Sequence, residues 1–184
     1  GLTNFSAQVD DNSQVTLTAP DRATDSSASS HNGFIATQGS NGTQIYDSNG
    51  VLLKTFYQYG KAMEFDEDAN LFLADPTPVA GKYRIWRFPY LGNNNWAFGQ
   101  VYCQVNGQPR ALAIDSGTLY IGLGDAWNSN VYTCAGQGHT PVLFGGPDDP
   151  SRQLQDIEID PDGKLWTARV ASGYQRFPLT GGFE

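Results

Sequence analysis

The chain has 184 residues and a formal net charge of −8; 39% of its residues are hydrophobic and 16% are charged. This length fits one domain, or two at most, and the abundance of turn-forming residues with only one methionine excludes a helical bundle. The acidic balance, with basic residues scattered along the chain, excludes nucleic acid as an expected partner. No window approaches the roughly 18 apolar residues of a membrane-spanning helix, so we also expect no membrane insertion.

Four segments share the pattern of a strand, a tight turn and a second strand. They read SAQVDDNSQVTL from residue 6, AMEFDEDANLFL from 62, ALAIDSGTLYI from 111 and DIEIDPDGKLW from 156. The spacing of the copies, about 45 to 56 residues, is typical of a supersecondary unit that recurs along a chain. Apolar residues alternate with period two on both sides of each turn, as half-buried strands require. Each copy is therefore predicted to open with a β-hairpin.

A third strand is predicted in every copy and a fourth strand in the first three copies only. The third strands lie at 44–46, 83–88, 130–134 and 174–177, and the fourth strands at 51–56, 96–103 and 141–144. Four-stranded antiparallel units of this size cannot bury their apolar faces alone and stack radially as the blades of a β-propeller. We therefore predict an all-β fold, a β-propeller of about four four-stranded antiparallel blades whose last blade is incomplete. A β-sandwich with similar hairpins is the alternative.

The predicted blades have approximate boundaries that follow the copies. They span about residues 4–58, 60–106, 109–146 and 152–184, with a Ser-rich insertion at 24–32 in the first blade. Because the last blade lacks its outer strand, we expect either a piece of a longer propeller or a ring completed by a second copy. The open sheet edge then predicts self-association.

The last copy, DIEIDPDGKLW followed by GYQRFPLTG, resembles the blades of NHL-type and two-component-regulator propellers and of the gluconolactonase-like superfamily. The third copy is similar, whereas the first 59 residues match poorly. The resemblance implies the fold but leaves the function open, since such blades occur in sensors, scaffolds, lactonases and lyases.

The resemblance to lactonases also implies an axial metal, held by acidic and amide side chains, with one ligand at the position of Asp156. The corresponding residues of the other copies are Ala62, Ala111 and approximately Ser6, which are not metal ligands of that kind. A hard cation needs six or more oxygen ligands, so we expect no metal cofactor.

Calcium is the weaker alternative at the turn formed by Asp66, Asp68 and Asn70. These residues have the opening spacing of a calcium-binding loop, but the loop's terminal glutamate is missing. Turn formation explains all three side chains.

Cys103 and Cys134 fall in strands of adjacent predicted blades and are the only cysteines. We predict a disulfide between them, with two buried thiols as the alternative. The disulfide and the composition together favour an extracellular or periplasmic location.

A set of aromatic side chains next to amides forms the predicted ligand-binding surface. It consists of Tyr90, Trp96 and Trp127 with Asn94 and Asn128. Aromatic rings with amide neighbours stack on sugar faces and also anchor protein interfaces. For Trp96 and Trp127, packing within the core is the alternative.

Two function classes are compatible with these patterns. The leading hypothesis is an extracellular, non-catalytic module that binds a glycan or a protein surface, or that acts as a structural subunit. The alternative is a lactonase-like or lyase-like enzyme with an axial site near Asp156. Its acid–base groups would come from Asp156, His139, Glu64 and Glu158.

Overall fold

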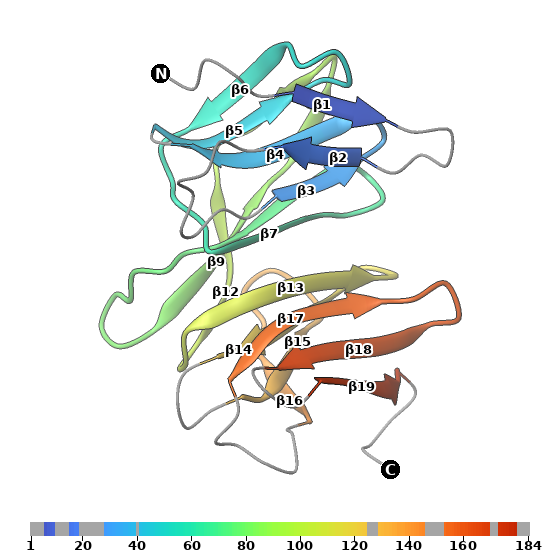
Figure 1. Cartoon of the computed structure of the whole chain (residues 1–184). Coiled ribbons are helices and arrows are strands. Elements are labelled where there is room, and N and C mark those ends of the chain that lie inside the picture. The colour runs from blue at the N-terminus through green and yellow to red at the C-terminus, as the bar shows by residue number, and fades with distance from the viewer. Residues whose placement is uncertain are drawn as a thin grey trace.

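The computed structural model describes residues 6–9, 15–18, 28–39, 41–124, 129–145, 153–169 and 173–179. Every regular element within these ranges is a β-strand (Figure 1). None of the described segments forms a helix long and apolar enough to cross a membrane. The predicted all-β class is therefore confirmed.

Four of the sheets are blades, in which the strands lie side by side in chain order from the inner strand outwards. Blade 1 contains β3 (Ala28–His31), β4 (Phe34–Gly39), β5 (Gly42–Tyr46) and β6 (Leu52–Phe56). Blade 2 contains β7 (Ala62–Phe65), β8 (Leu71–Ala74), β9 (Tyr83–Phe88) and β12 (Gln100–Val105). Blade 3 contains β13 (Pro109–Asp115), β14 (Thr118–Leu123), β15 (Val131–Cys134) and β16 (Val142–Gly145). Blade 4 contains β17 (Leu154–Ile159), β18 (Lys164–Arg169) and β19 (Gly173–Pro178).

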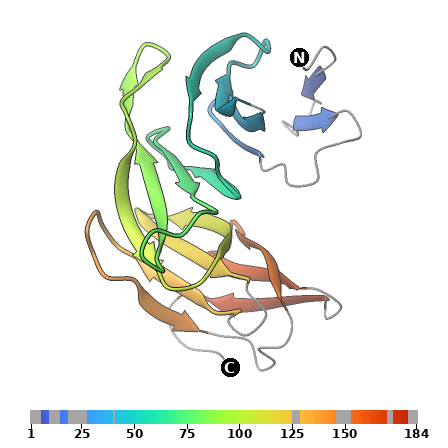
Figure 2. The same cartoon turned by 90° about the vertical axis from the view of Figure 1, so that its left-hand side faces the viewer.

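Successive blades follow one another along an arc, as Figure 2 shows. The inner strands β3, β7, β13 and β17 contact each other in this order. Antiparallel sheets that fan out from adjacent inner strands are the arrangement of a β-propeller. The predicted propeller architecture, with three strands in the last described blade, is confirmed.

The first blade begins later in the chain than the sequence pattern indicates. Residues 28–31, expected within an insertion, form the inner strand β3, whereas the hairpin of β1 (Ser6–Val9) and β2 (Val15–Thr18) is a separate two-stranded sheet. A two-residue turn joins β3 to β4, with Asn32 at φ 49° and Gly33 at φ 80°. Asn-Gly is the residue pair that such a tight hairpin turn prefers, so β3 and β4 form the hairpin that opens blade 1.

A second small sheet interrupts blade 2. The predicted strand at 96–103 is split, because Trp96 belongs to β11 (Asn95–Trp96), which pairs with β10 (Tyr90–Gly92), and the outer strand β12 starts only at Gln100. Asn93 and Asn94 both have positive φ, as the turn between these short strands requires. The chain leaves blade 2 after β9, forms the β10–β11 hairpin and re-enters the blade at β12.

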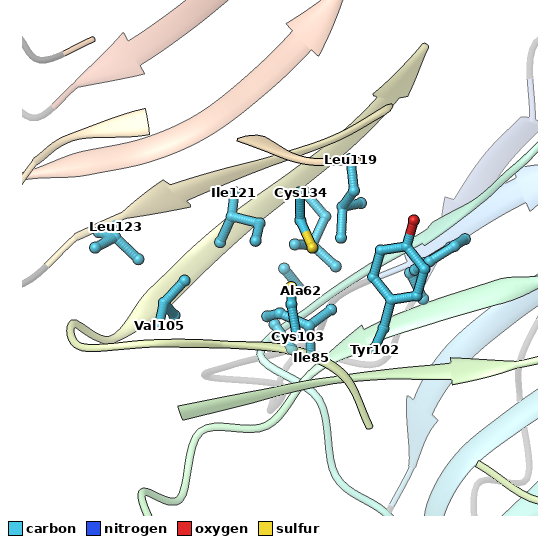
Figure 3. Packing of buried hydrophobic residues seen from close by; sticks show 12 residues of the cluster. Ala62, Ile85, Tyr102, Cys103, Val105, Leu119, Ile121, Leu123 and Cys134 are labelled. Atoms are coloured by element: carbon cyan, nitrogen blue, oxygen red, sulfur yellow. The ribbon is translucent and has the colours of Figure 1, made fainter. Parts of the chain in front are cut away.

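Apolar side chains fill the space between neighbouring blades. Ile45 and Phe56 of blade 1 pack with Leu71 of blade 2, and Ile121 of blade 3 packs with Ile85 of blade 2 (Figure 3). Blades 3 and 4 share a third cluster. At this last junction Gly122 is required for close approach, because a Cβ atom there would lie 2.5 Å from Leu154 Cδ2.

The outward face of blade 4 differs from the faces that are covered by a following blade. Phe72 and Tyr120 stand opposite the inner strand in blades 2 and 3 and are 2% and 6% exposed. At the same place in blade 4, Trp166 is 37% exposed and donates its indole N–H to Asp160 at 2.8 Å. Arg176 stacks over Trp166 and contacts Asp160 at 2.9 Å. A polar network therefore occupies the position of an apolar contact.

Three hairpin turns share one hydrogen-bonding pattern, centred on Asp47, Asp66 and Asp160. In each, one carboxylate oxygen of the aspartate accepts the backbone N–H groups two and four residues later. Aspartate side chains favour turns because they satisfy these amides. In the second turn, the other oxygen of Asp66 also accepts Nδ2 of the buried Asn70 at 2.7 Å.

Replacing Asp66 by alanine is expected to destabilise the fold by about 2 kcal/mol, since buried Asn70 loses its acceptor and two turn amides lose theirs. Asp68→Ala, at an exposed position of the same turn, is the matched control and is expected to cost less than about 0.5 kcal/mol. Urea denaturation of both variants measures the difference. Equal effects would show that the Asp66 carboxylate contributes nothing specific.

Candidate functional site

A cavity of about 370 Å³ lies where three inner strands begin. Its walls come from residues 62–64 of β7, 110–112 of β13 and 155–158 of β17, and from Lys61 just before β7. In a propeller, this is the region of the central channel. Its charged lining residues are Lys61, Glu64, Arg110, Asp156 and Glu158. We call this cavity the axial pocket.

Two β-bulges shape the axial pocket. The register of β13 with β14 shifts between Pro109 and Ala111, and that of β17 with β18 shifts between Leu154 and Asp156. The residue inside each bulge, Arg110 or Gln155, lines the pocket. A bulge redirects side chains, and bulges are common beside binding sites. The same backbone irregularity has therefore placed a polar side chain in the pocket from two successive blades.

Arg110 is held in a defined position. Its Nε–H donates to the carbonyl oxygen of Gly124 at 3.1 Å. A Cβ atom on Gly124 would lie 2.4 Å from Arg110 Cγ and 2.6 Å from the Leu154 carbonyl oxygen, so glycine is needed for the arginine stem to cross here. One edge of the guanidinium of this lining residue is therefore already bonded to the backbone.

Asp156 and Glu158 lie two residues apart on β17, so both project from the same face of the strand. Oδ1 of Asp156 accepts the backbone N–H of Ile157 at 3.0 Å. Burial by the pocket walls raises the pKa of Asp156 above its usual value. Burial and, second, the charge of Asp156 raise the pKa of Glu158. Perturbed acids in a cleft are candidates for binding or proton transfer.

The structure brings together three of the four predicted acid–base residues. Glu64 lines the axial pocket from blade 2, together with Asp156 and Glu158 of blade 4. His139 does not line it; this exposed residue lies in the turn between β15 and β16, where its backbone N–H donates to Gly136 at 3.2 Å. The reason is topological, because that turn belongs to the outer half of blade 3.

Trp96 does not belong to the predicted aromatic ligand-binding surface. This side chain is 1% exposed, donates Nε1–H to Ala69 at 2.8 Å and packs edge-on against Phe34. Trp96 therefore belongs to the core, and the prediction that it contacts a ligand is wrong. Tyr90 is half-buried against the same two rings.

The amide part of the predicted surface is only partly described. Asn94 is exposed at the tip of the β10–β11 hairpin, and Trp127 and Asn128 lie outside the described residues. The exposed apolar residues near this hairpin, which the sequence pattern did not single out, are Leu91 at 61% and Phe98 at 90%.

The metal implied by the resemblance to lactonases does not fit the residues present. Ala62 and Ala111 take the places of Asp156 at the starts of the other two inner strands of the pocket. Across the part of the chain that the structure describes, no three His, Cys, Asp or Glu side chains are grouped to hold a metal. At the alternative calcium position, both oxygens of Asp66 accept hydrogen bonds from Asp68 and Asn70 within the turn.

Cys103 of β12 and Cys134 of β15 meet between blades 2 and 3 (Figure 3). Both are buried free thiols in the structure. The hydrogen bond with Cys134 and, second, burial raise the pKa of the Cys103 thiol above its usual range. Cys134 Sγ in turn lies 3.3 Å from the carbonyl oxygen of Gly136. The predicted disulfide remains a prediction, and the two sulfur atoms are neighbours across the blade junction.

No protein-family model and no curated protein matches the chain by sequence. Solved propeller structures are similar in fold. A gluconolactonase from Xanthomonas campestris shares 16% identity, with a TM-score of 0.60, over 79% of this chain and 55% of its own. A structure of the nidogen/laminin complex shares 13% identity, with a TM-score of 0.64, over 92% of this chain and 65% of its own. A streptogramin B lyase shares 13% identity, with a TM-score of 0.58, over 84% and 54%.

The chain thus spans between 54% and 65% of the length of these three structures. They include enzymes and a protein complex, so the similarity supports the propeller fold and leaves the function open.

Asp156→Asn is expected to stabilise the protein at neutral pH by less than about 1 kcal/mol, because the pocket walls desolvate the carboxyl only in part and the residue keeps contact with solvent. A raised pKa means that the fold disfavours the ionised carboxylate, and this penalty is fully present at pH 7. It disappears as the pH falls through the folded pKa and below the ordinary value of 3.8.

Thermal denaturation of Asp156→Asn and the parent at pH 7.5 and pH 3.5 measures this effect, with the exposed Asp68→Asn as control. A lower melting temperature of Asp156→Asn at pH 7.5 would contradict it, since the carboxylate would then have a stabilising partner.

Oxidation of Cys103 and Cys134 is expected to link blades 2 and 3. Oxidised glutathione would accept the two electrons and two protons, and closure of a loop of about thirty residues would stabilise the fold by about 3–4 kcal/mol in the chain-entropy model. Non-reducing peptide mass spectrometry and denaturation with and without reductant check this. Cys103→Ser is the control, and unreacted thiols with unchanged stability after oxidation would refute the pairing.

Proposed function

We propose that the chain is a non-catalytic β-propeller module that binds a polar ligand, a carbohydrate or an exposed protein segment, in the axial pocket. The observation that carries this proposal is the convergence of charged side chains from three blades on one cavity, with two of the polar lining residues redirected by bulges. Small-molecule sites are usually concave, with a few polar groups that fix the orientation of the ligand.

The composition of the pocket wall favours binding over chemistry. Arg110 is fixed by a backbone carbonyl, and Asp156 accepts a backbone amide, so both are oriented before a ligand arrives. Preorganised groups lower the entropic cost of association. No histidine lines the pocket, and the metal of the lactonase-like propellers has no fitting set of ligands among the described residues.

An extracellular or periplasmic location is part of the same proposal. A disulfide between Cys103 and Cys134 would support export, because such bonds persist in oxidising compartments. The protein complex among the similar structures, that of nidogen and laminin, gives a precedent for a propeller in protein binding.

An acid–base enzyme is the second candidate, and the raised pKa values of Asp156 and Glu158 favour it. In this case Glu158, the carboxyl with both burial and a neighbouring charge against its ionisation, would act as the acid. Turnover of a lactone, with and without added divalent metal, that disappears in Asp156→Ala would establish this function in place of simple binding.

Binding is tested by screening glycan and peptide arrays, followed by titration of the ¹⁵N-labelled chain with any hit. We expect amide shifts at the starts of β7, β13 and β17 and a loss of affinity of at least about tenfold in Asp156→Arg, which adds bulk and reverses the charge. Asp68→Arg is the matched control on an exposed turn and should bind normally.

The variant Phe98→Ser distinguishes binding in the axial pocket from binding at the β10–β11 hairpin. If a hit loses affinity in Phe98→Ser and keeps it in Asp156→Arg, the ligand binds the hairpin and the axial proposal is wrong. Arrays without any hit would leave the pocket without a binding function of the proposed kind.

A further inference from the structure

The axial pocket has two charged sides that come from different blades. Arg110 of blade 3 forms a basic side, Asp156 and Glu158 of blade 4 form an acidic side, and blade 2 adds one residue of each charge, Lys61 and Glu64. Among the described residues, Arg110 makes no ion pair with either acid within 4.0 Å. Arg110 and these two acids therefore share one cavity without a direct ion pair between them.

The basic side is suited to a carboxylate. The Nε edge of the Arg110 guanidinium is occupied by the Gly124 carbonyl at 3.1 Å, and this bond fixes the plane of the group. Its terminal nitrogens carry further N–H donors in a planar fork, which matches the two oxygens of a carboxylate. Since Gly124 has no side chain, the arginine stem can lie against the backbone there, in the space that a Cβ atom would otherwise fill.

The acidic side is suited to a cationic donor. Asp156 and Glu158 project from one face of β17, and the charge of Asp156 disfavours ionisation of Glu158. Oδ1 of Asp156 is bonded to Ile157 N–H, which leaves Oδ2 for a ligand. An ammonium group offers three donors and a positive charge, so it relieves the repulsion between the two carboxylates.

We infer that the axial pocket binds a zwitterion of amino-acid or short-peptide size, with its carboxylate on Arg110 and its ammonium group between Asp156 and Glu158. This inference rests on the proposed binding function and names the class of its ligand. The volume of about 370 Å³ is at the small end of the range of about 300–1,000 Å³ that is usual for small-molecule sites. Gln155, in the second bulge, adds an amide that can bond the peptide group between the two ends.

Four versions of one dipeptide test the charge requirement. They are glycylglycine, N-acetylglycylglycine without the ammonium group, glycylglycinamide without the carboxylate, and N-acetylglycylglycinamide without either. Chemical-shift titrations of the ¹⁵N-labelled chain give their affinities. We expect glycylglycine to bind at least about tenfold more tightly than either singly blocked form, because hydrogen bonds to charged groups are the strong ones.

Variants at the two sides of the pocket test which residue binds the carboxylate and which binds the ammonium group of the dipeptide. Arg110→Gln should reduce the discrimination between glycylglycine and glycylglycinamide and leave the preference for a free ammonium group. Glu158→Gln should have the converse effect. Arg110→Lys keeps the charge but lacks the planar fork, so it should recover only part of the preference for the carboxylate. Arg87→Gln in β9, outside the pocket lining, is the control.

The outcomes separate this inference from the proposed function. Equal affinities for the four dipeptides, or binding of a neutral sugar at the same amides with no dipeptide binding, would overturn the zwitterion and leave a binding pocket. An equal loss for all four dipeptides in both variants would also overturn it. If neither sugars nor dipeptides shift the amides of the pocket, the inference and the proposed function are both wrong.

Discussion

The packing of apolar sheet faces between neighbouring blades is the interaction on which the rest of this structure depends. A four-stranded sheet has two faces, and a single sheet in water would expose at least one apolar face. Residues such as Ile45, Phe72 and Ile121 are at most 2% exposed because another blade covers them. Each such side chain contributes about 1.5–3 kcal/mol when it is buried. The same packing sets the inner strands next to each other, so residues of β7, β13 and β17 converge on one cavity.

Much of the fold follows from local pattern. Period-two alternation with an aspartate-rich turn predicts the hairpins that open blades 2, 3 and 4, because a half-buried strand needs that alternation. The first blade does not follow from this pattern alone. SAQVDDNSQVTL has the right alternation, but Ala28–His31 and Phe34–Gly39 form the hairpin of blade 1 around Asn32-Gly33. Period-two alternation of apolar residues predicts that a hairpin forms. Which hairpin becomes part of a blade depends on tertiary packing.

The axial pocket could be predicted only in part. Asp156, Glu158 and Glu64 lie in predicted inner strands, and equivalent positions of a repeat meet at the axis, so the sequence pattern groups them. No sequence pattern indicated Arg110 and Gln155, because a bulge adds a single unpaired residue and does not repeat along the chain. Trp96 belongs to the core, which was the alternative to ligand contact, for a related reason. Its polar neighbours suggest a surface, but the β10–β11 excursion turns the indole inward, onto Ala69 and Phe34.

In each of the two bulged strands, β13 and β17, the residue inside the bulge and the paired residues of the ladder have different roles. Ala111 and Ile157 are buried between blades and hold the sheets together, whereas the residues just before or between the paired positions, at 110 and 155, take no part in the ladder. Exchange of either side chain is therefore expected to leave the pairing of the flanking ladder positions unchanged. For protein engineering, this makes the two positions natural places at which to randomise a library and select new specificities, with the scaffold held constant.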